Sequence, residues 1–261
     1  MPALPQGALR PAARAHGVSG LFGPRLTALV AFAKAVCQAS FLTIRTFLPD
    51  VVRIYVSRGY LAKLIGKVSE SLAPSYAELF QRLPGESVLN IDETGHKENG
   101  ARFWTSCFRA QMYTFFRIDK CRGSKVLLEV LGEEFNGVPG CDYFSAYRKY
   151  MRDCDVLVQF CMAHLIRDVK FLLTLPGREV QAYGEPLRDA LRDLFGVIHR
   201  REKMSAAGFQ KALEAAREQV IKAATTRVPE AKHARNLPAR FRVIGEAYFR
   251  FITTLAIEDD E

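Results

Sequence analysis

Paired cysteine motifs and long apolar runs are both missing from this sequence of 261 residues. Its six cysteines include no Cys-x-x-Cys pair, which excludes a zinc ribbon and gives no sign of a disulfide framework. No window approaches the roughly 18 uninterrupted apolar residues that a membrane-spanning helix requires. We therefore expect a protein of the reducing cytoplasm with no membrane partner.

Apolar side chains and positive charge are what the chain has in quantity. Hydrophobic residues make up 49% of it, which is enough for a sizeable core. The formal net charge is +9, which favours a polyanionic partner, and nucleic acid is the leading candidate. Residues 1–20 contain Ala, Pro and Arg but no acid, so we expect a disordered leader, with a targeting segment as the alternative.

Residues 21–86 are expected to be helical. Apolar residues recur there at helical spacing, and we expect Pro49 to end a helix and residues 51–56 to be extended. Ser57 suits the N-cap of the next helix. A helix, a bend and a second helix with a basic outer face are compatible with helix-turn-helix DNA binding, although a solvated helix surface would have the same pattern. The residues that we assign to DNA binding in this helix are Arg58, Tyr60, Lys63 and Lys67.

Residues 87–176 have a different pattern, in which short apolar runs alternate with helices. The expected order is strand, strand, strand, helix, strand, helix, strand, helix. Three hairpin-connected strands followed by α/β crossovers describe a mixed sheet covered by helices, which is the layout of the ribonuclease-H-like fold. The expected fold class is therefore α/β, with the first and fourth strands side by side.

Each of these two neighbouring strands ends in an aspartate. Asp92 follows the apolar run of residues 88–91, and Asp142 follows residues 137–141. We expect the two carboxylates to face each other and to bind a divalent cation such as Mg²⁺, which prefers oxygen ligands. A single aspartate at the end of a strand more often has a structural role, in which it caps a helix or forms a turn, so that alternative stays open. Glu93 should point to the opposite face of the strand and form a salt bridge or support the site without binding metal.

Beyond residue 176 the pattern becomes entirely helical, and we expect a helical region over residues 177–255. Its last helix, placed at residues 236–253, mixes arginine with aromatic side chains. Such a mixture can stack on bases and pair with phosphates, but a basic helix that packs on its own domain is the alternative. An acidic tail occupies residues 256–261. The arginines that we assign to DNA binding in this region are Arg235, Arg240 and Arg242.

Four blocks of sequence resemble one known family, the DDE transposases of the insertion-sequence-66 type found in bacteria. The blocks lie at residues 89–95, 137–147, 161–168 and 245–251, and the first of them reads Leu-Asn-Ile-Asp-Glu-Thr-Gly. The resemblance implies a ribonuclease-H-like catalytic domain with a helical insertion. It also implies metal-dependent cutting and joining of DNA.

The resemblance also implies a cofactor and partners. Asp92 and Asp142 match the first two catalytic acids of the family, so they are the expected ligands of Mg²⁺ or Mn²⁺. The expected partner is double-stranded DNA at the transposon ends, and self-association or other proteins of the element are possible further partners. Paired metal ions in such sites activate the attacking oxygen and stabilise the leaving oxygen.

Family members continue, past the segment that matches residues 249–257, into a motif with a third catalytic glutamate. Here the acids of residues 258–261 follow instead, so we expect that the third acid is missing and that the chain is inactive alone. Two other functions stay open. One is a DNA-binding fragment that regulates transposition without catalysis, and the other is an unrelated metal-dependent nuclease on the same fold.

Cys161 and His164 lie three residues apart, where the fifth strand leads into a helix. They are too few for a zinc site, and we expect them to pack beside the active site, with His164 reaching a DNA phosphate. A direct role of His164 in catalysis is the less favoured alternative. Asp168 follows His164 by four residues, which would let its carboxylate orient the imidazole.

Overall fold

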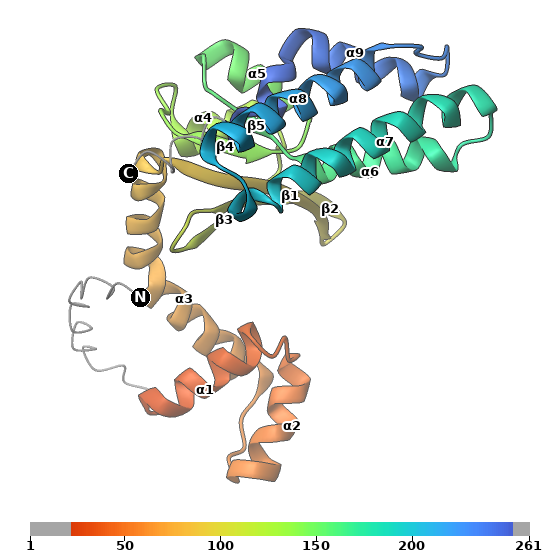
Figure 1. Ribbon diagram of the computed structural model, residues 1–261. Helices are drawn as coiled ribbons and strands as arrows, with labels where there is room; N and C mark the ends of the chain where they lie inside the picture. Colours follow the sequence, from red (N-terminus) through yellow and green to blue (C-terminus); the bar gives the residue numbers. More distant parts are fainter. Residues whose placement is uncertain (1–21, 253–261) are drawn as a thin grey trace. The chain divides into compact units, whose positions relative to one another are not determined.

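The computed structural model describes residues 22–252, and the chain divides into two compact units between Ala77 and Glu78 (Figure 1). The sequence placed this boundary after residue 86. The intervening residues belong to the second unit because Leu83 is fully buried in its core. None of the helices in the described part of the chain is long and apolar enough to span a membrane.

The first unit consists of helices around a small apolar core. Ser40 Oγ caps α2 by accepting a hydrogen bond from Thr43 N at 3.0 Å. Ser57 Oγ does the same for α3, accepting from Tyr60 N at 3.1 Å. The buried side chains of this core are Phe22, Val30, Ile44, Leu48, Leu61 and Leu64. The helices are α1 (Pro24–Ala35), α2 (Phe41–Val52) and the part of α3 (Arg58–Arg82) that precedes Glu78.

The sequence prediction for the end of α2 is wrong. Pro49 does not end this helix, which continues to Val52 and stops where Arg53 has a φ of 57°. Residues 51–56 form no strand. A proline removes only one hydrogen bond of the helix, and the buried side chain of Leu48 keeps the last turn packed on the core.

The second unit contains a five-stranded sheet in the order β3-β2-β1-β4-β5 (Figure 1). β1, β2 and β3 are antiparallel, whereas β4 runs parallel to β1 and β5 parallel to β4. The predicted α/β class and the position of the first strand beside the fourth are confirmed. The strands are β1 (Val88–Glu98), β2 (Ala101–Arg109), β3 (Thr114–Asp119), β4 (Val138–Cys141) and β5 (Gln159–Phe160). The helices that follow β3, β4 and β5 are α4 (Ser124–Leu131), α5 (Ser145–Cys154) and α6 (Met162–Thr174).

The rest of the second unit is helical, with α7 against α6, α8 against α7 and α9 against α8 (Figure 1). One hydrophobic core extends from the sheet through these helices. The helix predicted at residues 236–253 instead ends at Ile244, because the chain turns into a 3-10 helix that buries Tyr248. The α-helices are α7 (Arg178–Ile198), α8 (Ala206–Thr225) and α9 (Lys232–Ile244). The 3-10 helices are η1 (Leu83–Gly85), η2 (Arg201–Lys203) and η3 (Gly245–Tyr248).

The edge strand β5 is tied to the segment after α9 by the side chain of Gln159. Its Nε2 donates a hydrogen bond to Tyr248 O at 3.0 Å, and its Oε1 accepts one from Phe251 N at 3.0 Å. η3 is in contact with β5 as a result. The amide side chain thus joins β5 to a segment about ninety residues further along the chain.

Gly137 lets β4 pair with β1. A Cβ at this position would lie 2.2 Å from the carbonyl oxygen of Glu86 and 2.9 Å from that of Ser87. The next residue donates its backbone N–H to Ser87 O at 2.8 Å, which begins the parallel pairing. Only glycine fits here without moving one strand away from the other.

We expect the substitution Gly137→Ala to lower the free energy of unfolding by about 2 kcal/mol, because a Cβ would overlap backbone atoms. Gly196→Ala in α7 is the matched control, since a Cβ there meets nothing within 4 Å. It should instead raise the free energy of unfolding by about 0.5–1 kcal/mol, as glycine is unfavourable inside a helix. Urea denaturation followed by circular dichroism measures both. Equal effects of the two substitutions would contradict the role assigned to Gly137.

Candidate functional site

A cleft of about 350 Å³ opens where β1, β2, β4, β5 and α6 meet. Both strand-end acids, Asp92 and Asp142, line it, together with side chains from the other elements. The cleft thus lies at the edge of the sheet where the sequence placed the two acids. Its further lining includes Asn90, Cys107, Arg109, Cys161, His164 and Phe251.

The pairing of β1 with β4 brings the two acids to the same level of the sheet. Val88 pairs with Val138 and Asn90 with Gly140, a constant offset of fifty positions. The paired segment ends there, and continuing the same offset by two residues sets Asp92 opposite Asp142. One parallel strand pair therefore brings together two acids that are fifty positions apart in the sequence.

The two carboxylates differ in their surroundings. Asp92 is exposed, and its Oδ1 accepts a hydrogen bond from the backbone N of Glu93 at 2.9 Å. Asp142 is partly buried, and its Oδ1 accepts one from the backbone N of Phe144 at 2.8 Å. That second bond is the turn-forming contact that a strand-end aspartate commonly makes. The structural role considered for Asp142 is therefore present, and its other oxygen remains for a further partner.

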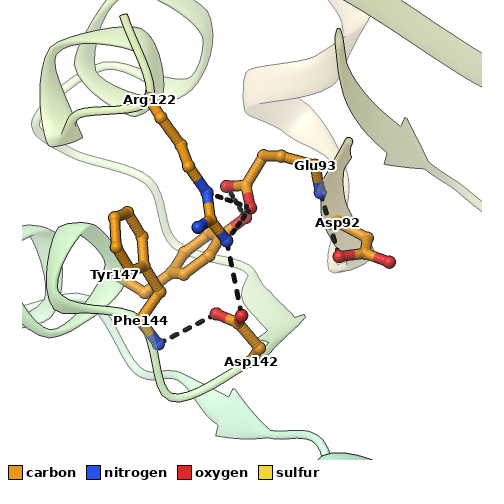
Figure 2. Close-up of polar contacts among 6 residues, drawn as sticks. All are labelled: Asp92, Glu93, Arg122, Asp142, Phe144 and Tyr147. Atoms are coloured by element: carbon orange, nitrogen blue, oxygen red, sulfur yellow. Dashed lines mark hydrogen bonds and ion pairs between the residues drawn. The ribbon is translucent and has the colours of Figure 1, made fainter. Parts of the chain in front are cut away.

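The other oxygen of Asp142 faces a buried ion pair (Figure 2). Glu93, whose side chain is only 6% exposed, pairs with Arg122 at 3.2 Å between Oε2 and Nη2. Its Oε1 also accepts a hydrogen bond from the Tyr147 hydroxyl. The same Nη2 of Arg122 lies 3.6 Å from Asp142 Oδ2. Figure 2 shows Glu93 and Asp142 converging on Arg122, with Asp92 directed away from it.

Two aromatic rings also contact the Arg122 guanidinium. Its central carbon lies 3.9 Å from the ring centroid of Phe144 and 4.8 Å from that of Trp104. Burial raises the pKa of Glu93, while the hydrogen bond from Tyr147 and the charge of Arg122 act against this. Arg122 thus links two carboxylates from neighbouring strands.

Sequence reasoning missed Arg122 and Tyr147. Glu93 was expected to form a salt bridge, but its partner lies in the loop before α4, 29 residues further on. A single arginine in a loop belongs to no periodic pattern, and Tyr147 looked like one more apolar position of its helix. The only available signal was that an acid directed into the covered face of a sheet needs a cation.

His164 lines the cleft as predicted for a residue beside the two acids. Within residues 22–252 its Nδ1 is buried and has no hydrogen-bond partner. The expected contact from Asp168 is not made to this atom, because Asp168 Oδ2 instead accepts a hydrogen bond from Arg240 Nη1 at 2.7 Å. Cys161 also lines the cleft and is partly buried, so it packs beside the site.

Arg240 is engaged inside the protein, which argues against the predicted contact with DNA. Its side chain is only 16% exposed, it pairs with Asp168, and its guanidinium lies 4.4 Å from the ring centroid of Tyr143. Arg235 is exposed and pairs loosely with Glu230 at 3.3 Å. Arg242 is exposed on α9.

In the first unit, the predicted DNA-binding residues differ in accessibility. Arg58, Lys63 and Lys67 are exposed on α3. Tyr60 is half-buried, and its ring packs edge-on against Phe22 with the centroids 5.2 Å apart. Tyr60 therefore belongs to the core of this unit, and the three cations are the accessible members of the predicted set.

The donor set of the cleft fits a hard divalent cation in part. Asp92 and Asp142 offer carboxylate oxygens from adjacent strands, and Mg²⁺ is commonly held by one or two carboxylates together with water and substrate phosphates. Among residues 22–252 no group of three or more His, Cys, Asp and Glu side chains is close enough to hold a metal. Two carboxylates are thus what the described chain supplies.

Comparison with known proteins adds one match. A family model described as the transposase IS66 family matches residues 19–260. No curated protein matches the chain.

We expect Tyr147→Phe to lower the free energy of unfolding by about 1.5–3 kcal/mol at neutral pH, because a buried carboxylate loses a hydrogen bond. The raised pKa of Glu93 means that its contribution to stability falls as the pH rises through that pKa. Tyr147→Phe removes a hydrogen bond to the ionised form of Glu93. The loss of free energy of unfolding should therefore be larger at about pH 8 than at about pH 4.

Tyr150→Phe is the control, since the Tyr150 hydroxyl donates to the neutral carbonyl of Gly132 at 2.6 Å. Its deficit should be smaller, about 1 kcal/mol, and similar at both pH values. Urea denaturation in EDTA measures all variants. A deficit of Tyr147→Phe that does not change with pH would show that its partner is not the ionised Glu93.

Proposed function

The chain belongs to the IS66 family of transposases, and from this premise we propose that it binds the DNA ends of a bacterial insertion sequence and cleaves and joins them with divalent metal ions. The observation that supports this best is the pair of aspartates on adjacent parallel strands, level with each other and lining one cleft. We propose that the sheet and its covering helices are of the ribonuclease-H-like type. The order of elements and the placing of both acids support that assignment.

Asp92 and Asp142 are the residues that we propose bind Mg²⁺ or Mn²⁺. Such an ion supplies activation of an attacking oxygen and stabilisation of a leaving oxygen in phosphoryl transfer. Arg122 holds Asp142 in place and offsets the repulsion between its carboxylate and that of Glu93. His164 is proposed to donate a hydrogen bond to a DNA phosphate, because it lines the same cleft as the two acids.

The first unit is proposed to bind double-stranded DNA, with α2 and α3 as a helix-turn-helix. Residues 22–77 contain seven Lys and Arg against two Asp and Glu, which supports electrostatic attraction to phosphates. The exposed cations in this unit's part of α3 are Arg58, Lys63 and Lys67. On the second unit, Arg235 and Arg242 are proposed as further contacts, and Arg240 is not.

A second candidate function is a DNA-binding regulator of transposition that performs no catalysis. It is favoured by the finding that the described residues bring no third acid to the two aspartates. Oligonucleotide cleavage and strand-transfer assays with Mg²⁺ and Mn²⁺ separate the two functions. Activity that Asp92→Asn abolishes supports the transposase reaction, and DNA binding without any cleavage supports the regulator.

We expect Asp92→Asn and Asp142→Asn each to weaken the binding of Mn²⁺ or Mg²⁺ by about tenfold or more. Loss of a group that only orients a metal ligand already costs about tenfold or more in metal affinity, and loss of the ligand itself should cost at least as much. Because Asp92 is exposed, Asp92→Asn should leave the free energy of unfolding nearly unchanged. Glu98→Gln, on the same strand but outside the cleft, should leave metal affinity unchanged. Isothermal titration calorimetry measures these affinities, and equal binding by all variants would remove the two acids from the metal site.

We expect Lys63→Ala and Lys67→Ala each to reduce the slope of log affinity for duplex DNA against log salt concentration by about one, because each lost phosphate contact releases one counterion fewer. Lys211→Ala, an exposed lysine on α8, is the control and should leave the slope unchanged. Filter binding over a salt series provides the data. Binding by the wild-type protein that does not depend on salt would be incompatible with phosphate contacts.

A further inference from the structure

Arg109 is the last residue of β2 and lines the cleft beside the two acids. It belongs to a row of residues that crosses all five strands at one level of the sheet. Arg109 pairs with Thr114 on one side and with Asn90 on the other, and Asn90 pairs with Gly140, which pairs with Gln159. Arg109 is the only Lys or Arg among the described residues that line this cleft.

The charge of Arg109 is not offset by a neighbour, unlike the charges of other arginines near the cleft. Arg122 pairs with Glu93 and Asp142, and Arg240 pairs with Asp168. Arg109 is exposed and makes no ion pair with any residue of the described range 22–252.

The nearest groups in the row are also neutral. The side chain of Asn90 lies over Gly140, where an added Cβ would be 2.9 Å from Asn90 Oδ1. Gln159 is held by its bonds to the segment after α9. A free guanidinium therefore faces a polar but uncharged strip of the sheet.

Asp92 is the diagonal neighbour of Arg109 in the antiparallel ladder. Asp92 pairs with Cys107, and Arg109 follows Cys107 by two residues on the same face of β2. Diagonal positions of this kind are about 7–8 Å apart, a separation that a long side chain can span. The two side chains form no ion pair with each other in the described chain, so one phosphate group can lie between them.

We propose that Arg109 binds a phosphodiester group of the DNA strand that lies in the cleft, next to the carboxylate pair. This inference rests on the proposed function, because it takes DNA as the substrate of the site. The planar guanidinium can donate two parallel hydrogen bonds to the non-bridging oxygens of one phosphate. Arg109 is in this sense a positioning residue, which sets the register of the strand against Asp92 and Asp142.

The first test is the salt dependence of duplex DNA binding by the full chain in EDTA, using an oligonucleotide of about 30 base pairs, well above the site sizes of single binding modules. Arg109→Ala should reduce the log-log slope by about one, while Arg109→Lys should retain the slope but bind more weakly. Arg102→Ala is the matched control, because Arg102 is exposed on the same strand and lies outside the cleft. It should behave as the wild-type protein does.

The second test is a double-mutant cycle with Asp92→Asn, also in EDTA. Without metal, Asp92 repels the phosphate that Arg109 holds, so Asp92→Asn should strengthen DNA binding in the wild-type background. That gain should be smaller in the Arg109→Ala background, since the phosphate is no longer held beside Asp92. Thermal unfolding of each variant confirms that the comparison is made between folded proteins, and Arg109→Gln replaces Arg109→Ala if the latter is unstable.

The outcomes separate this inference from the proposed function. Salt-dependent binding of DNA by the wild-type protein together with an unchanged slope for Arg109→Ala overturns the role of Arg109 alone. An additive cycle overturns the placement of the phosphate beside Asp92. Failure of the wild-type protein and every variant to bind DNA at low salt overturns the proposed function and this inference together.

Discussion

The parallel pairing of β1 with β4 is the contact on which the arrangement of the site depends. It converts a separation of fifty residues into a shared level of the sheet and sets both aspartates at the rim of one cleft. The pairing in turn requires that nothing fills the space beside Gly137, just before β4, where a Cβ would overlap the carbonyl oxygen of Glu86. The position of the two acids thus depends on the lack of a side chain at Gly137, which permits the pairing of β1 with β4.

The second constraint is electrostatic. The carboxylates of Glu93 and Asp142 converge near the ends of β1 and β4, and such a pair repels itself unless a cation is included. Arg122 meets this need from a loop, where it contacts two aromatic rings and forms ion pairs with Glu93 and Asp142. Asp92 remains outside this arrangement and exposed, so the site combines one fixed acid with one accessible acid.

The sequence predicted the parts of this structure that depend on local pattern. The order of strands and helices, the neighbouring β1 and β4 and the position of His164 near the acids all followed from apolar spacing and from the resemblance to a family. Contacts between distant loops and helices leave no such pattern, which is why Arg122 was missed and why Arg240 was assigned to DNA although Asp168 neutralises it. Pro49 misled for another reason, since tertiary packing outweighed a local helix-breaking signal.

The hydrogen bonds of Gln159 also bear on how the protein is made. They join β5 to residues 89 and 92 positions further along the chain, so they can form only after those residues have been synthesised. Until Phe251 has left the ribosome, the outer edge of β5 lacks the contacts that cover it, and exposed strand edges are prone to pair with other chains. Contacts between residues so far apart in sequence also form slowly. During synthesis there is therefore a period in which the uncovered β5 edge can pair with other nascent chains on the same polysome.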